Sequence, residues 1–248
     1  MDKKVVLITG ACGQLGRALC TAYNNAGATV IATDTHATAQ NLPAGVHYSA
    51  MDVTNKEDVL HCFSTVADAH GALDVLINNA GVSCFESFEE RPESSIDWVM
   101  NVNLKGTLLC IQTYVNLFDE KKYAQGSIVN IASMYGIISP DPCIYTDCPR
   151  KNSEIYGATK AGVIQMTRYF AVHLASRHIR VNAVSPGGIL NPENPQGTDF
   201  QKNYAARCPM GRMALQEEIT GGVLFLSSPA ASYITGHNLV IDGGMSCW

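Results

Sequence analysis

The chain has 248 residues and a formal net charge of −5, and 46% of its residues are hydrophobic but only 16% are charged. This acidic balance argues against a nucleic-acid partner, no apolar run reaches the ~20 residues of a membrane span, and the N-terminus has no signal-peptide pattern. The nine cysteines are scattered without metal-ligand spacing, so we expect a cytoplasmic protein with reduced cysteines, no metal site and no membrane partner.

Strand-like and helical segments alternate along the whole chain. Apolar, β-branched runs predict strands at 4–9, 28–33, 46–50, 73–77, 127–132, 180–185 and 238–242. Helical periodicity predicts helices at about 16–26, 55–70, 98–118, 156–174 and 215–226. With no composition break and no repeat, this order predicts an α/β fold in a single domain over 1–248. We expect a Rossmann-like, doubly wound, parallel seven-stranded sheet with helices on both faces.

The turn after the first strand has the glycine spacing of a dinucleotide-binding motif. Gly10 permits the tight turn, Gly13 lets the backbone approach a pyrophosphate, and Gly16 lets the helix pack close to the sheet. The helix N-terminus then faces the anion. Glycines alone are a weak signal, and a glycine-rich turn without a ligand stays the alternative.

Asp34 directly follows the second strand, at the position where an acid bonds the adenosine ribose hydroxyls. A carboxylate there repels a 2′-phosphate, and Thr35, His36 and Ala37 offer no cation to bind one. We therefore expect NAD as the cofactor, with NADP disfavoured. A solvated turn aspartate is the plainer alternative.

Tyr156 and Lys160 lie four positions apart in a helical segment and so share one face of that helix. A nearby ammonium favours the phenolate and lowers the pKa of a tyrosine. Such a pair can exchange the proton of an alcohol while a cofactor takes its hydride. The spacing is common by chance, so its meaning depends on the rest of the chain.

Several motifs occur in one order: Thr9-Gly-x-x-Gly-x-x-Gly16, Asn78-Asn-Ala-Gly81, Ser133, Tyr156-x-x-x-Lys160, Pro186-Gly187 and Asp242-Gly-Gly244. Together they resemble the single-domain subgroup of the short-chain dehydrogenase/reductase family, over the whole chain.

The resemblance implies a catalytic set of four residues. Tyr156 acts as the general acid/base, Lys160 lowers its pKa and binds the nicotinamide ribose, and Ser133 holds the substrate oxygen. Asn103 supports a water-linked proton relay through the lysine. The resemblance also implies cofactor contacts from the glycine turn, the adenine end, the ribose and the nicotinamide end: Gly10, Gly13, Gln14, Leu15, Gly16, Asp34, Asp52, Val53, Asn79, Ala80, Gly81, Tyr156, Lys160, Pro186, Gly187 and Ile189.

The sequence departs from the family pattern in two places. In the glycine turn, Gln14 takes the place of the usual glycine. The resulting spacing resembles the extended subgroup, which includes nucleotide-sugar epimerases, but the chain has no room for their C-terminal substrate domain. Ser133 and Tyr156 are also 23 positions apart (156 − 133), more than is usual in the family.

We predict that two loops contact the substrate. The long segment at about 137–153 should wall the substrate pocket, with plain surface decoration as the alternative. Its polar content favours a hydroxylated or charged substrate. The second wall should be 188–212, a mobile lid with no regular element. Five of its side chains are unranked candidates for contacting a sugar or an acid group: Asn191, Asn194, Lys202, Arg207 and Arg212.

The predicted function is therefore NAD(H)-dependent interconversion of a secondary alcohol and a ketone. The substrate is a small, polar molecule such as a sugar or sugar acid. Within the family, the chain looks similar to bacterial oxidoreductases of surface-sugar and flagellin-glycan pathways. The alternatives are an NADPH-dependent 3-oxoacyl thioester reductase, a nucleotide-sugar epimerase and a non-catalytic cofactor-sensing protein on the same fold.

The resemblance also implies assembly into a homotetramer, or a dimer, through the helices that carry Asn103 and Tyr156 and through the last strand. The charged fraction is below the ~25% of a typical globular protein, which is compatible with surface buried between subunits. We expect the apolar tail at 245–248 to pack on a neighbouring subunit.

Overall fold

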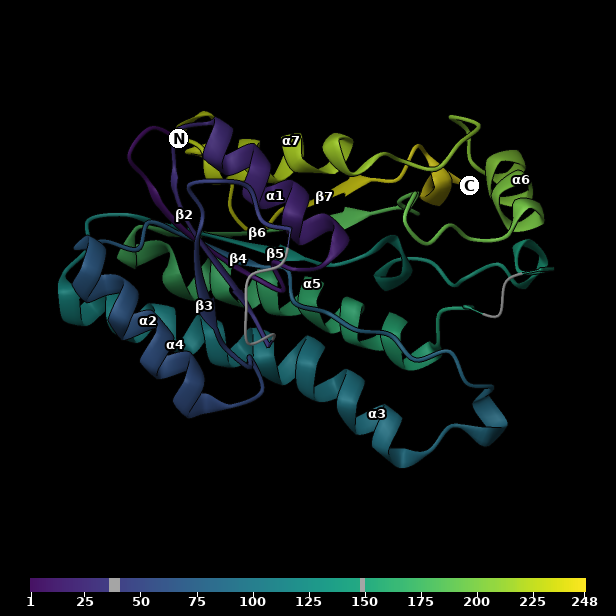
Figure 1. Cartoon of the computed structure of the whole chain (residues 1–248), viewed down its shortest axis with the longest axis horizontal. Helices are drawn as coiled ribbons and strands as arrows, with labels where there is room; N and C mark the ends of the chain where they lie inside the picture. Colours follow the sequence, from purple (N-terminus) through teal and green to yellow (C-terminus); the bar gives the residue numbers. More distant parts are fainter. Residues whose placement is uncertain (36–40, 148–149) are drawn as a thin grey trace.

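The computed structural model describes residues 1–35, 41–147 and 150–248. A parallel sheet of seven strands in the order β3-β2-β1-β4-β5-β6-β7 lies between two layers of helices (Figure 1). The strands are β1 Val5–Thr9, β2 Thr29–Asp34, β3 His47–Ala50, β4 Val75–Asn78, β5 Gly126–Ile131, β6 Ile179–Pro186 and β7 Asn238–Ile241. The predicted fold class and strand order along the chain are confirmed.

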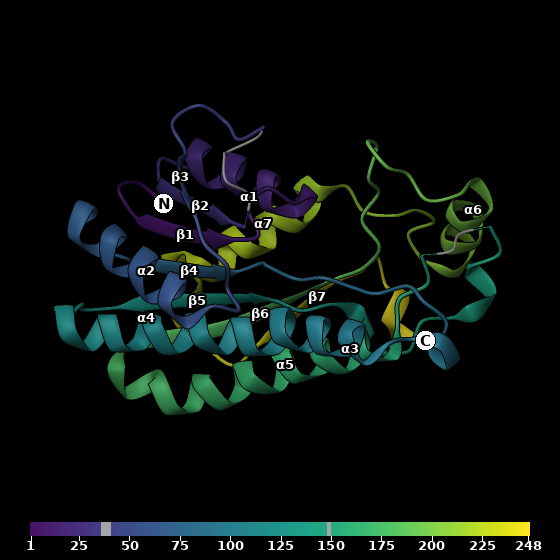
Figure 2. The same ribbon diagram turned by 60° about the horizontal axis from the view of Figure 1, so that its bottom comes forward.

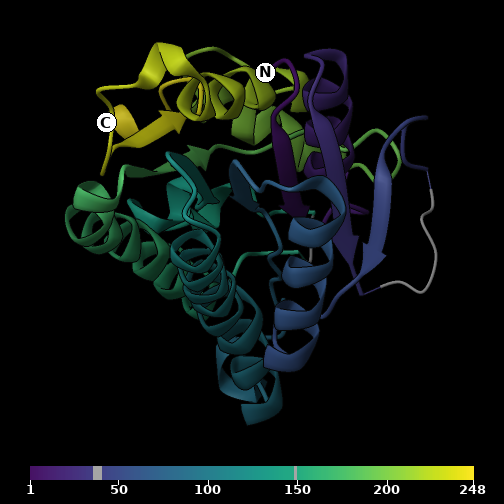
Figure 3. The same cartoon turned by 90° about the vertical axis from the view of Figure 1, so that its left-hand side faces the viewer.

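Helices cover both faces of the sheet, as the views in Figures 2 and 3 show. On one face lie α1 (Gln14–Asn25) and α7 (Gln216–Ser227), which contact each other. On the other face lie α2 (Lys56–His70), α4 (Thr107–Lys121) and α5 (Glu154–Leu174). Each layer buries its own apolar cluster against the sheet, one around Leu7 and Ile111 and the other around Ile8 and Leu19. Alternate residues of β1 thus serve opposite faces, as a strand covered on both sides requires.

The strand order reverses between β1 and β4, since β2 and β3 lie to one side of β1 and β4 to β7 to the other. In open parallel sheets the connections diverge at such a point and leave a crevice at the carboxyl ends of the strands. Asn79 ties the two sides together there: its Nδ2 donates to the carbonyl oxygens of Thr9 and Gly10, at 2.9 Å each.

The helix predicted at 98–118 is longer and is interrupted. It begins as α3 (Glu93–Met100), passes through a π-helical segment at Asn101–Gly106, and continues as α4. The start was missed because only Val99 of α3 is buried, so its first residues lack an apolar stripe. The π segment brings Gly106 against Val53, where an added Cβ would lie 2.7 Å from the valine Cγ2.

The prediction that 188–212 has no regular element is wrong. The segment contains α6 (Thr198–Arg207), which lies outside the two helical layers near the C-terminus (Figure 1). Phe200, Tyr204 and Cys208 are buried at a spacing of four residues, the stripe of an amphipathic helix. Its cap comes from far away in the sequence, because Asp147 accepts hydrogen bonds from the backbone N–H groups of Asp199 (2.9 Å) and Phe200 (2.8 Å).

Two further observations concern the described residues only. None of their helices combines the length and apolar character needed to cross a membrane. Nor do their His, Cys, Asp and Glu side chains group in threes in a way that would hold a metal ion.

Candidate active site

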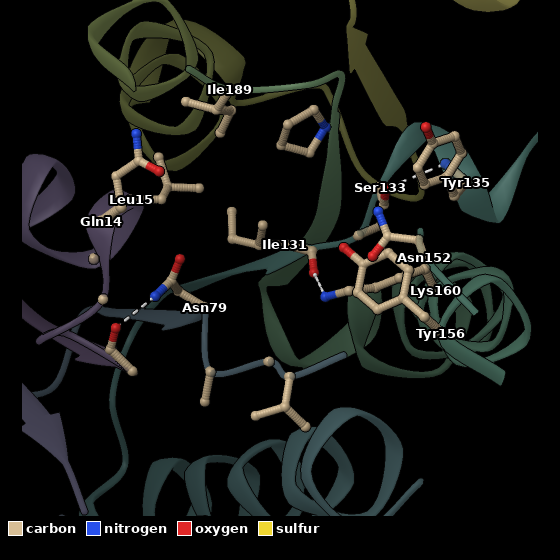
Figure 4. A pocket seen from close by; sticks show the side chains of 18 of the residues that line it. Gln14, Leu15, Asn79, Ile131, Ser133, Tyr135, Asn152, Tyr156, Lys160 and Ile189 are labelled. Carbon is tan, nitrogen blue, oxygen red and sulfur yellow. Dashed lines mark hydrogen bonds between the residues drawn. The ribbon is translucent and has the colours of Figure 1, made fainter. Parts of the chain in front are cut away.

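A cavity of about 660 Å³ lies at the carboxyl ends of the strands, where the sheet order reverses (Figure 4). Its walls come from the glycine turn, the ends of β2, β4, β5 and β6, the start of α5, and the two loops predicted to contact substrate. Most of the predicted site residues line it: Gly10, Gly13, Gln14, Leu15, Gly16, Asp34, Val53, Asn79, Ala80, Gly81, Ser133, Tyr156, Lys160, Pro186, Gly187 and Ile189. Asp52 and Asn103 are the two that do not.

Glycine suits each of the three positions of the turn for a different physical reason. Gly10 has a φ of +63°, in the left-handed region that favours glycine. A Cβ at Gly16 would collide with the Gly10 carbonyl oxygen, so this glycine permits close packing within the turn. A Cβ at Gly13 would meet only that oxygen, at 3.4 Å, so here a hydrogen leaves space for something other than protein.

The N-terminus of α1 is a fitting anion site. Gly13 is its N-cap and contributes no side-chain hydrogen bond to the first N–H groups of the helix. Such free N–H groups, with the positive end of the helix dipole, favour a phosphate. Gln14 bridges this turn to the lid, since its Nε2 donates to the Leu190 carbonyl oxygen at 2.6 Å.

Asp34 lines the same cavity beside the glycine turn. Its Oδ2 accepts from the backbone N–H of Cys12 (2.9 Å) and its Oδ1 from that of Thr35 (2.8 Å), which fixes the carboxylate. His36 and Ala37, which the NAD prediction also used, lie outside the described residues. The nearby cation Arg17 is bound to Glu193 of the lid, at 2.7 Å.

The adenine end is only partly as predicted. Val53 lines the cavity, whereas the Asp52 carboxylate turns to its own loop. Its Oδ1 accepts from the Thr54 backbone N–H and from the Thr54 hydroxyl, at 2.8 Å each. A contact between Asp52 and adenine stays a prediction.

The proposed acid/base group comes together at the start of α5. Ser133 lies two residues after the end of β5, and its Oγ accepts from the Tyr135 N–H at 3.1 Å. Ser153 caps α5 by accepting from the Tyr156 N–H at 3.3 Å, which places Tyr156 in the first turn. Lys160 follows one turn later, with its Nζ 5.6 Å from the centre of the Tyr156 ring. The Nζ donates to the Ile131 carbonyl oxygen at 2.8 Å (Figure 4).

The expected lowering of the Tyr156 pKa by Lys160 does not appear in the protein alone. Burial raises the pKa of Tyr156, and a hydrogen bond with Ser133 opposes this. Burial also lowers the pKa of Lys160 to about 8, because a desolvated ammonium is disfavoured. The lysine is only 4% exposed. Desolvation is therefore the largest cause of the pKa shift of each group.

Asn103 lies behind the cavity wall in the π-helical segment. Its Nδ2 donates to the Val82 carbonyl oxygen and to the Thr159 hydroxyl, at 3.0 Å each, and its Oδ1 accepts from the Val82 N–H at 2.8 Å. A Cβ at Gly81 would lie 3.1 Å from Lys160 Nζ and 3.5 Å from Asn103 Oδ1. Asn103 thus joins the turn after β4 to α5 close to the lysine, and its relay role stays a prediction.

The turn after β6 is held between the C-terminal strand and the lid. A Cβ at Gly187 would lie 2.8 Å from the Asp242 Cα, and the Gly188 N–H donates to the Tyr204 hydroxyl at 2.7 Å. Asp242 closes its own turn by accepting from the N–H groups of Gly244 (2.9 Å) and Ser246 (2.8 Å). The Asp-Gly-Gly motif therefore supports the turn that carries Pro186 and Gly187.

The loop at 137–153 is part of the cavity wall, through Tyr145, Arg150 and Asn152. Several contacts join it to the lid. Asp147 caps α6, the rings of Tyr145 and Phe200 lie 5.2 Å apart, and Arg150 Nη2 donates to the Pro195 carbonyl oxygen at 2.9 Å. The described parts of the two loops therefore pack together in the cavity wall.

None of the five lid side chains named from the sequence lines the cavity. Arg212, for example, pairs with Glu218 at 2.7 Å. The cavity-lining residues that the sequence reasoning did not name include Tyr135, Asn152, Gln196, Phe200, Tyr204 and Met213, whereas Tyr145 and Arg150 belong to the loop that it predicted to wall the pocket. The buried spacing of Phe200, Tyr204 and Cys208 was the available signal for α6, whereas nothing in the sequence singled out Gln196.

The C-terminal tail packs on its own lid helix. Met245 is buried, and Trp248 Nε1 donates to the Arg207 carbonyl oxygen at 3.2 Å. The Trp248 ring lies 5.6 Å from the Arg207 guanidinium and remains 70% exposed. A contact of this tail with a neighbouring subunit stays a prediction.

The fold and the site define a dinucleotide-dependent oxidoreductase. The profile of a family described as Enoyl-(Acyl carrier protein) reductase matches residues 10–246. The chain is 37% identical to the 3-oxoacyl-[acyl-carrier-protein] reductase FabG of Thermotoga maritima, over 99% of this chain and 98% of that protein. It is 33% identical to the NAD-dependent glycerol dehydrogenase of Listeria innocua, over 97% and 93%.

Solved structures agree with these relatives. A short-chain dehydrogenase from Leptospira borgpetersenii with bound NAD+ superposes with a TM-score of 0.91 at 38% identity, over 99% of this chain and 94% of that one. The ligand-free aldohexose dehydrogenase of Thermoplasma acidophilum superposes with a TM-score of 0.86 at 28% identity, over 100% and 95%. The chain belongs to the short-chain dehydrogenase/reductase family, as its motifs predict.

Proposed function

We propose that this protein is an NAD(H)-dependent oxidoreductase that interconverts a secondary alcohol and a ketone on a small, polyhydroxylated substrate. One observation carries the proposal: Ser133, Tyr156 and Lys160 line the same cavity as the glycine turn and Asp34. The side chains suited to proton transfer and the residues suited to binding a dinucleotide therefore line the same cavity. Relatives named as glycerol and D-threitol dehydrogenases support the substrate class.

In the proposed oxidation, the substrate hydroxyl binds between Ser133 and Tyr156. The serine hydroxyl fixes the oxygen, and the tyrosinate accepts its proton as the carbinol carbon gives up hydride. Bound NAD supplies the hydride acceptor and a positive charge on its nicotinamide ring, which favours the phenolate. In reduction, Tyr156 returns the proton to the carbonyl oxygen. In this proposal Lys160, whose Nζ donates to the Ile131 carbonyl oxygen, binds the ribose and supports the tyrosinate.

The test is nicotinamide absorbance with a panel of polyols, ketoses, sugar acids and 3-oxoacyl thioesters, run with NAD(H) and NADP(H) in parallel. We expect turnover of a polyol or ketose with NAD(H). No turnover of any alcohol or ketone, together with tight NADH binding, would favour the cofactor-sensing alternative instead.

A 3-oxoacyl thioester reductase is the second candidate, favoured by the relative at 37% identity that bears this name. Asp34 weighs against it if the reductant is NADPH, because a carboxylate at that position repels a 2′-phosphate. Thioester reduction with NADPH in the same panel would establish the second candidate and overturn the first.

We also propose a homotetramer in the cytoplasm. Exposed apolar side chains gather on the helices that carry Asn103 and Tyr156 or adjoin them: Trp98 (49% exposed), Leu108 (44%), Tyr169 (55%) and Val172 (75%). Large apolar patches on a soluble protein commonly mark contacts between subunits.

A further inference from the structure

We propose that Asn152 and Gln196 form a subsite that binds the hydroxyl groups beside the reacting carbon, and that it selects a neutral polyol or its ketose. The inference rests on the proposed alcohol–ketone reaction and assigns its substrate specificity to two side chains, one from each loop of the cavity wall. The two loops, 137–153 and 188–212, are far apart in the sequence, but hydrogen bonds join them in the fold.

Asn152 lies four positions before Tyr156 and lines the cavity. Figure 4 shows its side chain beside those of Ser133 and Tyr156, where the reacting oxygen would bind. The Ser83 hydroxyl bonds one end of its amide, with 3.0 Å between Ser83 Oγ and Asn152 Oδ1. This bond fixes the side chain and leaves the other end of the amide without a hydrogen-bond partner among the described residues. A fixed amide with one end unbonded is suited to a substrate hydroxyl on a neighbouring carbon.

Gln196 lines the same cavity from the lid. Its side-chain Oε1 is shielded from solvent and has no hydrogen-bond partner within the described part of the chain. The neighbouring Gln201 donates to the Gln196 backbone carbonyl, at 2.8 Å, and so holds the residue without satisfying its amide. A shielded acceptor without a donor is unfavourable, and rotation of the terminal amide toward a substrate hydroxyl would relieve this.

The cations of the wall argue for a neutral substrate. Among the described residues that line the cavity, only Lys160 and Arg150 carry a positive charge. Lys160 is bonded to Ile131, and Arg150 Nη2 donates to the carbonyl oxygens of Asn194 (3.3 Å) and Pro195 (2.9 Å). A carboxylate that recruited Arg150 would compete with this contact between the loops. Apart from the Asp34 carboxylate beside the glycine turn, the polar side chains that line the cavity are mostly amides and hydroxyls, which bind hydroxyl groups.

The test compares Asn152→Ala and Gln196→Ala with the unaltered enzyme on two substrate types. One is the best polyol among glycerol, threitol and arabinitol, and the other is 2-butanol, which has a secondary alcohol but no second hydroxyl. We expect each variant to lose roughly tenfold in kcat/KM on the polyol, the value of one good hydrogen bond, and to keep its rate on 2-butanol. Asn194→Ala is the matched control, because this lid amide does not line the cavity.

The outcomes separate the subsite from the reaction itself. If the unaltered enzyme oxidises no alcohol with NAD, the proposed function fails. If it oxidises a polyol and both variants match it, the subsite alone is refuted. An equal loss on polyol and 2-butanol, or a loss of NADH binding measured by fluorescence, would assign the two residues to folding or positioning. A preference for aldonates that Arg150→Ala abolishes would overturn the neutral-substrate inference.

Discussion

At the scale of single residues, the site is governed by desolvation. Tyr156 and Lys160 are four residues apart, yet burial raises the pKa of the phenol and lowers that of the ammonium. A hydrogen bond between Ser133 and Tyr156 lowers the pKa of the phenol and so opposes the effect of burial. The proposed tyrosinate therefore requires a ligand that adds positive charge close to the phenol. Each proposed role has its own consequence for a substitution.

Tyr156→Phe removes the hydroxyl that exchanges the proton. We expect kcat to fall by about 10²- to 10⁴-fold, with NADH affinity retained because the ring stays in place. Steady-state kinetics and NADH fluorescence measure the two effects. Tyr169→Phe, on the exposed face of α5, is the control and should leave both unchanged. Full activity in the Tyr156 variant would refute the acid/base assignment.

Asp34→Ala removes the carboxylate that repels a 2′-phosphate. We expect the ratio of kcat/KM for NAD to that for NADP to fall, through weaker NAD binding and weaker discrimination. Kinetics with both cofactors measure it. An unchanged ratio would contradict the assignment of cofactor preference to this side chain.

Burial of the Lys160 ammonium should lower the free energy of unfolding at neutral pH. Its pKa falls from 10.5 to about 8 on folding, so the unfolded chain binds more protons between these values and stability rises with pH across that window. The shift corresponds to about 3 kcal/mol, fully present below pH ~8. Lys160→Met should therefore raise the free energy of unfolding near pH ~7 by up to that amount, less the lost bond to Ile131, and the gain should shrink toward pH ~10.

Urea denaturation at both pH values measures this effect. Lys202→Met, at an exposed lid position, is the control and should show no such dependence on pH. A Lys160→Met gain that is the same at both pH values would show that the lysine titrates normally.

At the scale of elements, the sequence predicts what depends on local pattern and misses what depends on distant partners. The seven strands follow from apolar runs, and their parallel order from alternation with helices. Helix α6 was missed because its cap, Asp147, lies 52 positions before the Asp199 N–H that it accepts. Gln196 was missed for a similar reason: its position in the wall depends on how two loops meet, and no periodicity encodes that.

The joint between these loops can be tested at Gly197. A Cβ there would collide with the Asp147 carboxylate, so Gly197→Ala should displace the cap of α6. Loss of such a cap costs about 0.5–2 kcal/mol locally. We expect a raised KM and faster hydrogen exchange at the first amides of α6, with NADH binding retained.

Gly221→Ala is the matched control for this substitution, because an added Cβ there meets no atom within 4 Å. Its position inside α7 favours alanine over glycine. It should be neutral or slightly stabilising. Equal behaviour of the two variants would mean that the cap does not order the lid.

At the scale of the whole molecule, several large apolar side chains are exposed on the helices proposed to form the subunit contact. Val172, on α5, is 75% exposed, and Trp98 and Leu108 of α3 and α4 are 49% and 44% exposed. The helices α3 and α5, which carry Trp98 and Val172, contact each other. Tyr156, the proposed acid/base, lies on the same helix as Val172.

Val172→Glu should therefore split the proposed tetramer. A charge buried at a subunit contact without a partner is strongly unfavourable, so sedimentation should show a smaller species. Leu60→Glu is the control: this side chain is 40% exposed on α2, which is not one of the helices proposed to form the subunit contact, and its substitution should leave the assembly intact. Because the site lies within one chain, NADH binding should persist in the smaller species. If the unaltered protein sediments as a monomer, the tetramer proposal is refuted.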